Sequence, residues 1–115
     1  MRTRTILAYL SIAAGVAVGC RSLPPSKPES EFTAQEARGQ QVYNQNCSKC
    51  HYPTNTRSLH GPGLQAITKV KAMPSGAPPS DERLTAVIVR GRNMMPATPL
   101  SDDQLNDLLA YLKTL

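Results

Sequence analysis

The C-terminal end of the chain carries the clearest hydrophobic pattern. Beyond Ser101, leucines recur at positions i, i+3, i+4 and i+7, the spacing that lines one face of a helix. These leucines are Leu105, Leu108, Leu109 and Leu112. Ser101 and Gln104 fit a capping box, in which each side chain accepts a hydrogen bond from the other residue's main-chain amide. The pattern predicts an amphipathic helix that begins near Ser101.

A second capping box, at Thr33 and Glu36, predicts a helix that runs to about Asn46. The interior of this helix contains Gly39, and a glycine in the middle of a helix costs about 1 kcal/mol relative to alanine. A glycine at such a position indicates that another part of the backbone comes close to it. We therefore expect a close backbone contact at Gly39.

Two shorter helices are predicted in the middle of the chain. A helical stripe over 64–72 consists of Leu64, Ile67 and Val70. After a proline-rich loop, Ser80 is placed to cap a further helix, and Gly91 is placed to end it. No stretch alternates apolar and polar residues as a half-buried strand does. The predicted fold class is therefore all-α, with about four helices.

The N-terminal end predicts an exported protein. Two arginines precede an apolar run of 14 residues, which is shorter than the ~20 residues that a membrane-spanning helix needs. This pattern is typical of a secretory signal peptide, here residues 1–19. Its end, Ala17-Val18-Gly19-Cys20, resembles the lipobox of bacterial lipoproteins, which implies a lipid-modified Cys20 and a membrane anchor. An ordinary cleaved signal peptide and an uncleaved anchor remain alternatives.

Residues 20–32 follow the cleavage site and are rich in proline and serine. Such a segment contains too little apolar surface to build a core of its own. We expect it to be a tether that begins at the lipidated cysteine. The folded domain is then expected over 33–115.

The composition changes this picture in two ways. Aromatic residues make up 4% of the chain and tryptophan is absent, so the core of such a small domain is thin and is expected to need a cofactor, metal or disulfide. The formal net charge is +5, and Arg2 and Arg4 of the predicted leader contribute 2 of these charges. A mild positive charge with no basic run of five or more residues argues against nucleic-acid binding.

The candidate chemistry lies in Cys47-Ser48-Lys49-Cys50-His51. The pattern C-x-x-C-H is typical of c-type haem attachment, in which two thiols form thioethers with the two vinyl groups of haem. Cysteines three positions apart lie on one side of a helical turn, so both reach one edge of the ring. The adjacent imidazole of His51 then ligates the iron. One covalent haem would also fill the thin core and, with Cys20 lipidated, would account for all three cysteines.

Two other classes of function stay open at this point. A thiol–disulfide oxidoreductase would use Cys47 and Cys50 directly, but that class is expected in a βαβ context, and no strand is predicted here. A haem-based sensor or gas-binding module would keep the haem and leave one iron position open. The two classes differ from an electron carrier in colour and in ligand binding.

From Thr33 to Leu115, the chain resembles a class I monohaem bacterial cytochrome c. Gly39, followed by Tyr43 and then by Cys47, resembles the first helix of that family. Leu108 and Tyr111 resemble the residues of the last helix that pack across the glycine. The resemblance implies that the first and last helices cross at Gly39, within a small domain of about four helices around one covalent haem.

The resemblance extends to the loop after the haem motif. Gly61-Pro62-Gly63-Leu64 is similar to a loop of the family in which the proline carbonyl accepts a hydrogen bond from the haem histidine. By this match Pro62 orients His51 and raises its basicity, as residues behind a metal ligand commonly do. Leu64 is expected to pack against the haem.

The sixth iron ligand is expected from the loop before the last helix. The family usually offers a methionine directly before a proline, and Met95-Pro96 fits that position, with Met94 as the alternative. Met73 also precedes a proline, but no capped apolar helix follows it closely. His60, the only other histidine, is expected to be a surface residue.

Together these features imply a one-electron carrier rather than an enzyme, with His/Met ligation of one haem c. Its expected partners are a redox protein donor and acceptor, including membrane-bound oxidase or dehydrogenase complexes. The domain is expected in the periplasm or on the outer face of the cytoplasmic membrane, held by lipid at Cys20. We expect a monomer, because no apolar helix face is left without an assigned role.

Overall fold

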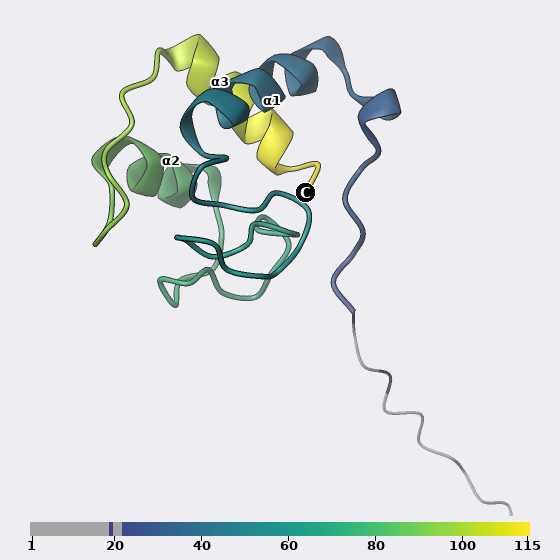
Figure 1. Ribbon diagram of the computed structural model, residues 1–115, viewed down its shortest axis with the longest axis horizontal. Coiled ribbons are helices and arrows are strands. Elements are labelled where there is room, and N and C mark those ends of the chain that lie inside the picture. The colour runs from purple at the N-terminus through teal and green to yellow at the C-terminus, as the bar shows by residue number, and fades with distance from the viewer. Residues whose placement is uncertain (1–18, 20–21) are drawn as a thin grey trace, which may run out of the picture.

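The computed structural model describes Gly19 and residues 22–115 (Figure 1). Most of the predicted signal peptide and Cys20 itself therefore lie outside the described residues. The elements are the 3-10 helix η1 (Glu29–Glu31) and the helices α1 (Ala34–Asn46), α2 (Asp81–Arg90) and α3 (Asp102–Leu112). The described part contains isolated bridges but no strand, which confirms the all-α class. No helix in this part is long and apolar enough to cross a membrane.

All three helices begin at the residues that the sequence predicts. The Thr33 hydroxyl accepts from the Glu36 amide at 3.2 Å, and the Glu36 carboxylate accepts from the Thr33 amide at 2.7 Å. Ser101 and Gln104 form the same reciprocal pair at the start of α3. These side chains satisfy amides that have no partner within the helix, and so they fix where each helix begins.

The prediction of a fourth helix over 64–72 is wrong. This stretch is a series of turns, because Ala66 has a φ of 56°, in the left-handed region that an α-helix of L-residues does not accommodate. Short-range hydrogen bonds, such as that from the Ile67 amide to the Leu64 carbonyl at 3.0 Å, replace the helical ones. One of the apolar residues of this stretch, Ile67, nevertheless packs in the core.

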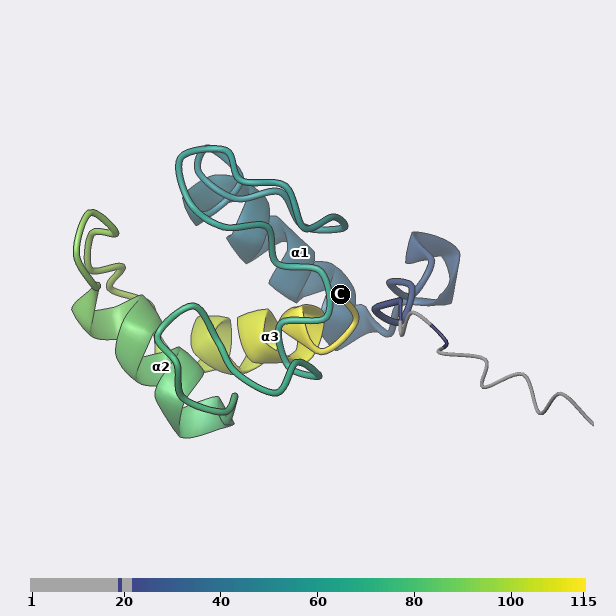
Figure 2. The same ribbon diagram turned by 90° about the horizontal axis from the view of Figure 1, so that it is seen from below.

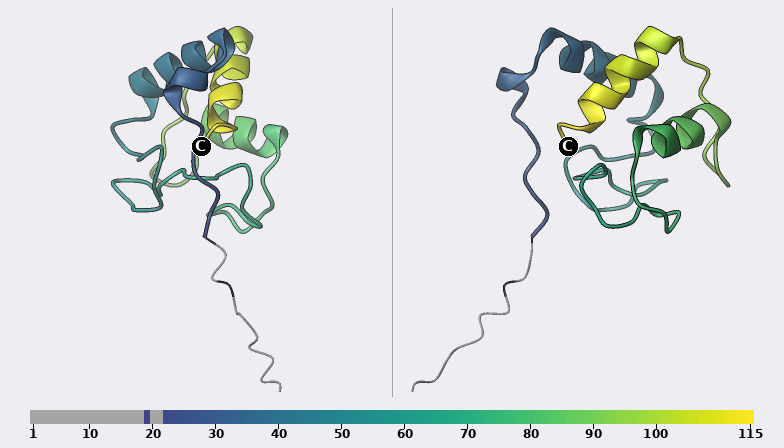
Figure 3. Two further views of the ribbon diagram at one scale, coloured as in Figure 1. Left: turned by 90° about the vertical axis from the view of Figure 1, so that its right-hand side faces the viewer. Right: turned by 180° about the vertical axis from the view of Figure 1, so that it is seen from behind.

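Helices α1 and α3 cross at Gly39 (Figures 1 and 3). A Cβ atom at this position would collide with the main-chain carbonyl of Asp107 and would lie 2.8 Å from the Cβ of Tyr111. Beside the crossing, the Tyr43 and Tyr111 rings lie with centroids 5.2 Å apart, and Arg38 pairs with Asp107 at 2.8 Å. The absence of a side chain at residue 39 is what allows the two backbones to touch.

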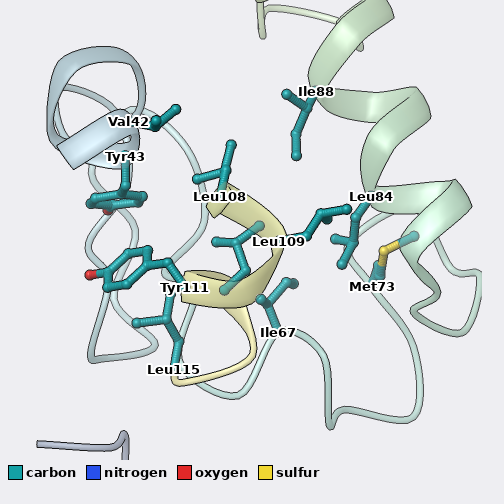
Figure 4. Close-up of a cluster of buried hydrophobic side chains, with 11 residues drawn as sticks. Val42, Tyr43, Ile67, Met73, Leu84, Ile88, Leu108, Leu109, Tyr111 and Leu115 are labelled. Atoms are coloured by element: carbon teal, nitrogen blue, oxygen red, sulfur yellow. The ribbon is translucent and has the colours of Figure 1, made fainter. Parts of the chain in front are cut away.

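The core is a single cluster between the three helices and the turns (Figure 4). It contains Val42, Tyr43, Ile67, Met73, Leu84, Ile88, Leu108, Leu109, Tyr111, Leu112 and Leu115. α2 lies beside α3, as Figure 2 shows. Half-buried residues from the loops, among them Cys47, Leu64 and Met95, pack against the rim of this cluster. Met73 lies inside the core.

The middle of the predicted tether contacts the helical domain. The Lys27 amide donates to the Thr114 carbonyl at 2.6 Å, and the Lys27 ammonium pairs with Glu36 at 2.8 Å. The Gln65 side chain donates to the Pro24 carbonyl at 3.3 Å. These contacts attach residues 24–27 to the end of α3, the start of α1 and the turns after residue 64.

Gly39→Leu is predicted to destabilise the protein, because the new side chain would separate α1 from α3. Overpacking a filled core typically costs about 1–3 kcal/mol, and backbone separation adds to it. Denaturant unfolding of the haem-loaded protein measures the loss. Gln41→Leu places the same side chain on the exposed face of the same helix and is expected to change stability by less than about 0.5 kcal/mol. Equal stability of the two variants would contradict a close crossing at Gly39.

Candidate haem site

The C-x-x-C-H motif begins where α1 ends. Cys47 is the C-terminal cap of α1, and its amide donates to the Tyr43 carbonyl at 2.8 Å. The amides of Cys50 and His51 both donate to the Cys47 carbonyl at 3.0 Å, which folds the motif into one tight turn. Both cysteines are free thiols, with Cys47 half-buried against the core and Cys50 exposed.

Burial disfavours the thiolate form of Cys47. Burial, together with the neighbouring Cys50, raises the pKa of the Cys47 thiol to about 11. The thiolate is the reactive form in thiol–disulfide exchange, so a thiol held protonated at neutral pH is a poor nucleophile. The described part of the chain also lacks the strands on which the thiol–disulfide alternative depends.

The imidazole of His51 is held in one orientation. Its Nδ1 atom lies 2.7 Å from the Pro62 carbonyl oxygen. A carbonyl only accepts hydrogen bonds, so Nδ1 carries the proton and Nε2 presents its lone pair. This is the tautomer that ligates a metal through Nε2, and the hydrogen bond behind the ring increases its basicity. His51 and Pro62 thus stand in the relation that the sequence resemblance implies.

Two glycines allow the loop after the motif to reach the histidine. A Cβ at Gly61 would lie 2.5 Å from Cε1 and 2.9 Å from Nδ1 of the His51 ring. The Gly61 amide also donates to the Cys50 carbonyl at 2.7 Å. At Gly63 a Cβ would collide with the Asn55 carbonyl and lie 2.7 Å from the carbonyl oxygen of Arg57. Neither glycine had a role assigned from sequence, although their positions on either side of Pro62 are the signal for such close packing.

Leu64 and His60, on either side of the Gly61–Gly63 segment, differ in exposure. The Leu64 amide donates to the Tyr52 carbonyl at 2.9 Å, and its half-buried side chain packs on the rim of the core. His60 is exposed, although it precedes Gly61 directly. The loop therefore brings Pro62 and Leu64 to the motif and leaves His60 at the surface.

The two methionines of the loop between α2 and α3 differ strongly in exposure. Met94 is 94% exposed, whereas Met95 is half-buried and packs against the core. The loop is tight, because the amides and carbonyls of Arg92 and Met95 bond to each other at 3.0 and 2.9 Å. Gly91 and Asn93 have φ values of 73° and 53°, which make this turn possible. The structure thus brings Met95, and not Met94, to the same cluster as Cys47.

The residues present fit a covalently attached haem. Two free thiols follow one helix end, an imidazole nitrogen is free to ligate, and a thioether lies on the same apolar rim. The half-buried apolar side chains of this rim supply the low-polarity surface that a haem ring requires. Two shallow hollows in the described part, one on α2 and α3 and one around Ser80, involve none of these residues.

An all-helical domain with this constellation is a c-type cytochrome. Residues 34–112, from the first residue of α1 to the last residue of α3, match the family described as "Cytochrome C oxidase, cbb3-type, subunit III", and the chain belongs to this family. It is also similar to cytochrome c6 of Diacronema lutheri, with 27% identity over 78 residues, which cover 66% of this chain and 90% of the relative. The protein therefore binds an iron-containing c-type haem covalently and transfers electrons rather than catalysing a reaction.

Gly61→Ala is predicted to displace the His51 ring, because the added methyl group would overlap Cε1. We expect a loss of stability of about 1–3 kcal/mol and altered His51 resonances in the NMR spectrum of the haem-loaded protein. At Gly76 an added Cβ meets nothing within 4 Å, although its φ of 86° strains any larger residue. Gly76→Ala therefore serves as the control for the His51 resonances only, because its backbone strain affects stability by itself. His51 resonances that move in neither variant would refute the contact.

Proposed function

We propose that this protein is a one-electron carrier of a membrane-associated redox chain, with His51 and Met95 as the two axial ligands of its haem iron. The observation that carries the proposal is the hydrogen bond between His51 Nδ1 and the Pro62 carbonyl, at 2.7 Å, which leaves Nε2 free to ligate. The half-buried position of Met95 on the core rim supports a second ligand from the loop before α3.

Each residue of the site has a separate task in this proposal. Cys47 and Cys50 hold the group at the end of α1, His51 ligates from one side, and Pro62 keeps the imidazole basic and fixed. When bound, the haem supplies an iron centre that cycles between the ferrous and ferric states. The thioether of Met95 is a soft ligand that favours the ferrous state and so raises the reduction potential.

The difference in exposure between the two methionines supports Met95 rather than Met94 as the ligand in this proposal. Met94 is 94% exposed and is not among the residues that pack against the core. Met95 already packs on the cluster that Cys47 contacts. If His51 and Met95 both ligated the iron, its surroundings would change little between the two oxidation states, which would suit rapid transfer.

Met95→Ala is predicted to keep the haem attached but to expose one iron position. The ferrous protein should then bind CO at once, and the reduction potential should fall by about 0.1 V or more, within the span of about 0.8 V over which axial ligands tune haems. CO difference spectra and a spectroelectrochemical titration measure both effects. Met94→Ala is the matched control and should change neither.

The alternatives give different outcomes in the same experiment. If Met94→Ala opens the iron and Met95→Ala does not, the ligand assignment is reversed. If the unaltered ferrous protein binds CO immediately, the haem-based sensor or gas-binding module replaces the electron carrier. Retained haem and intact electron transfer after Met95→Ala, without CO binding, would exclude Met95 as a ligand.

We further propose that lipid at Cys20 holds the domain on a bacterial membrane, in the periplasm or on the outer face of the cytoplasmic membrane. The Cys20 position at the end of a lipobox-like segment supports this anchor. The description of the matching family, which names an oxidase subunit, supports a membrane-bound oxidase or dehydrogenase complex among the redox partners. In this proposal the domain acts as a monomer.

Cys20→Ala is predicted to release the haem-loaded protein from membranes, because the acyl chains would be lost while the domain over 33–115 stays intact. Partition between aqueous and detergent phases of the unaltered chain and of the variant measures this change. Ser22→Ala, two residues further on, is the control and should remain in the detergent phase. A Cys20→Ala variant that stays in the membrane would point to an uncleaved anchor, and an unaltered protein in the aqueous phase would point to an ordinary signal peptide.

A further inference from the structure

We propose that Tyr43 is a positioning residue for the axial ligand: its hydroxyl holds the main-chain carbonyl of His51 and so couples the crossing of α1 and α3 to the place of the imidazole. The inference rests on the proposed function only in that His51 ligates the iron. In this proposal the Tyr43 hydroxyl has a function besides the packing of the ring at the helix crossing.

The hydroxyl group of Tyr43 donates a hydrogen bond to the His51 carbonyl, eight residues further along the chain. Tyr43 is 1% exposed and His51 is half-buried, so the contact is largely shielded from water. Buried polar groups in proteins are nearly always paired, and a buried carbonyl that loses its partner is costly. The hydrogen bond is therefore well placed to constrain the main chain of the residue that bears the ligand.

Two further polar atoms of His51, its amide and Nδ1, also form hydrogen bonds. Its amide donates to the Cys47 carbonyl at 3.0 Å, and its Nδ1 donates to the Pro62 carbonyl at 2.7 Å. With the Tyr43 hydroxyl on the carbonyl, Nε2 is the one polar atom of this residue without a hydrogen-bond partner in the described part of the chain. This is the atom that must stay free to ligate iron.

The position of the Tyr43 ring depends in turn on α3. The Tyr43 and Tyr111 rings lie side by side in Figure 4, with centroids 5.2 Å apart and planes tilted by 51°. Tyr111 lies at the crossing, because its Cβ is only 2.8 Å from the position that a Cβ at residue 39 would take. A continuous set of contacts therefore runs from the Gly39 crossing through Tyr111 and Tyr43 to His51.

Tyr111 provides a matched control for Tyr43. It is also a buried tyrosine, at 3% exposed, and it contacts the Tyr43 ring directly. Among the hydrogen bonds of the described residues, its hydroxyl makes none to His51. Removing one oxygen atom from either tyrosine leaves the ring packing in place, but only the change at Tyr43 removes the bond to the ligand residue.

The experiment compares Tyr43→Phe and Tyr111→Phe in the full, haem-loaded chain. The readouts are the paramagnetically shifted NMR resonances of His51 in the ferric protein and the reduction potential. We expect both to shift in Tyr43→Phe and to stay at the values of the unaltered protein in Tyr111→Phe. Unchanged His51 resonances in Tyr43→Phe, or equal shifts in both variants, would overturn the proposal.

A second measurement needs no variant and applies if Tyr43→Phe yields no haem-loaded protein. The Tyr43 hydroxyl proton of the unaltered protein should exchange slowly with water and give an NMR signal with a contact to His51. A rapidly exchanging hydroxyl would refute the hydrogen bond. The proposed function fails separately, if the unaltered protein shows no haem ligated by histidine and methionine.

Discussion

The structure depends first on the direct contact between two helix backbones at Gly39. Only a residue without a side chain lets α1 approach the Asp107 carbonyl and the Tyr111 Cβ of α3 so closely. This contact places Tyr111 against Tyr43, and the Tyr43 hydroxyl then reaches the His51 carbonyl. The crossing is therefore connected, through Tyr111 and Tyr43, to the turn that bears both cysteines and the histidine.

The second organising feature is the long stretch between α1 and α2. Residues 47–80 contain no helix or strand, and loops of that length in a small domain are uncommon unless they carry function. Here the loop folds back on itself through Gly61 and Gly63 and delivers Pro62 to the imidazole. The protein core is small and poor in aromatic residues, so a covalent haem supplies apolar surface that the chain itself lacks. The loop thus holds the cofactor ligand, and the cofactor in turn adds apolar surface to the small core.

Local sequence predicts the elements whose structure is decided locally. The caps at Thr33, Ser80 and Ser101 and the end of α2 at Gly91 follow from hydrogen bonds within a few residues, and all are found as predicted. The stretch 64–72 was mispredicted, because periodicity does not reveal that Ala66 adopts a left-handed φ. Likewise, the contact of Lys27 with Thr114 joins segments far apart in sequence, and no pattern in either segment predicts it. The Tyr43–His51 hydrogen bond spans eight residues, but it depends on how the turn after α1 folds back, which helical periodicity does not reveal.

The central claim is that Cys47 and Cys50 hold a haem covalently. The most direct test is the visible spectrum of the purified protein, oxidised and reduced, recorded before and after denaturation and acid–acetone extraction. The account predicts a sharp α band in the reduced state and colour that stays with the polypeptide through extraction. A colourless protein from a host that attaches haem to other chains, or colour that is extracted into the solvent, would contradict it.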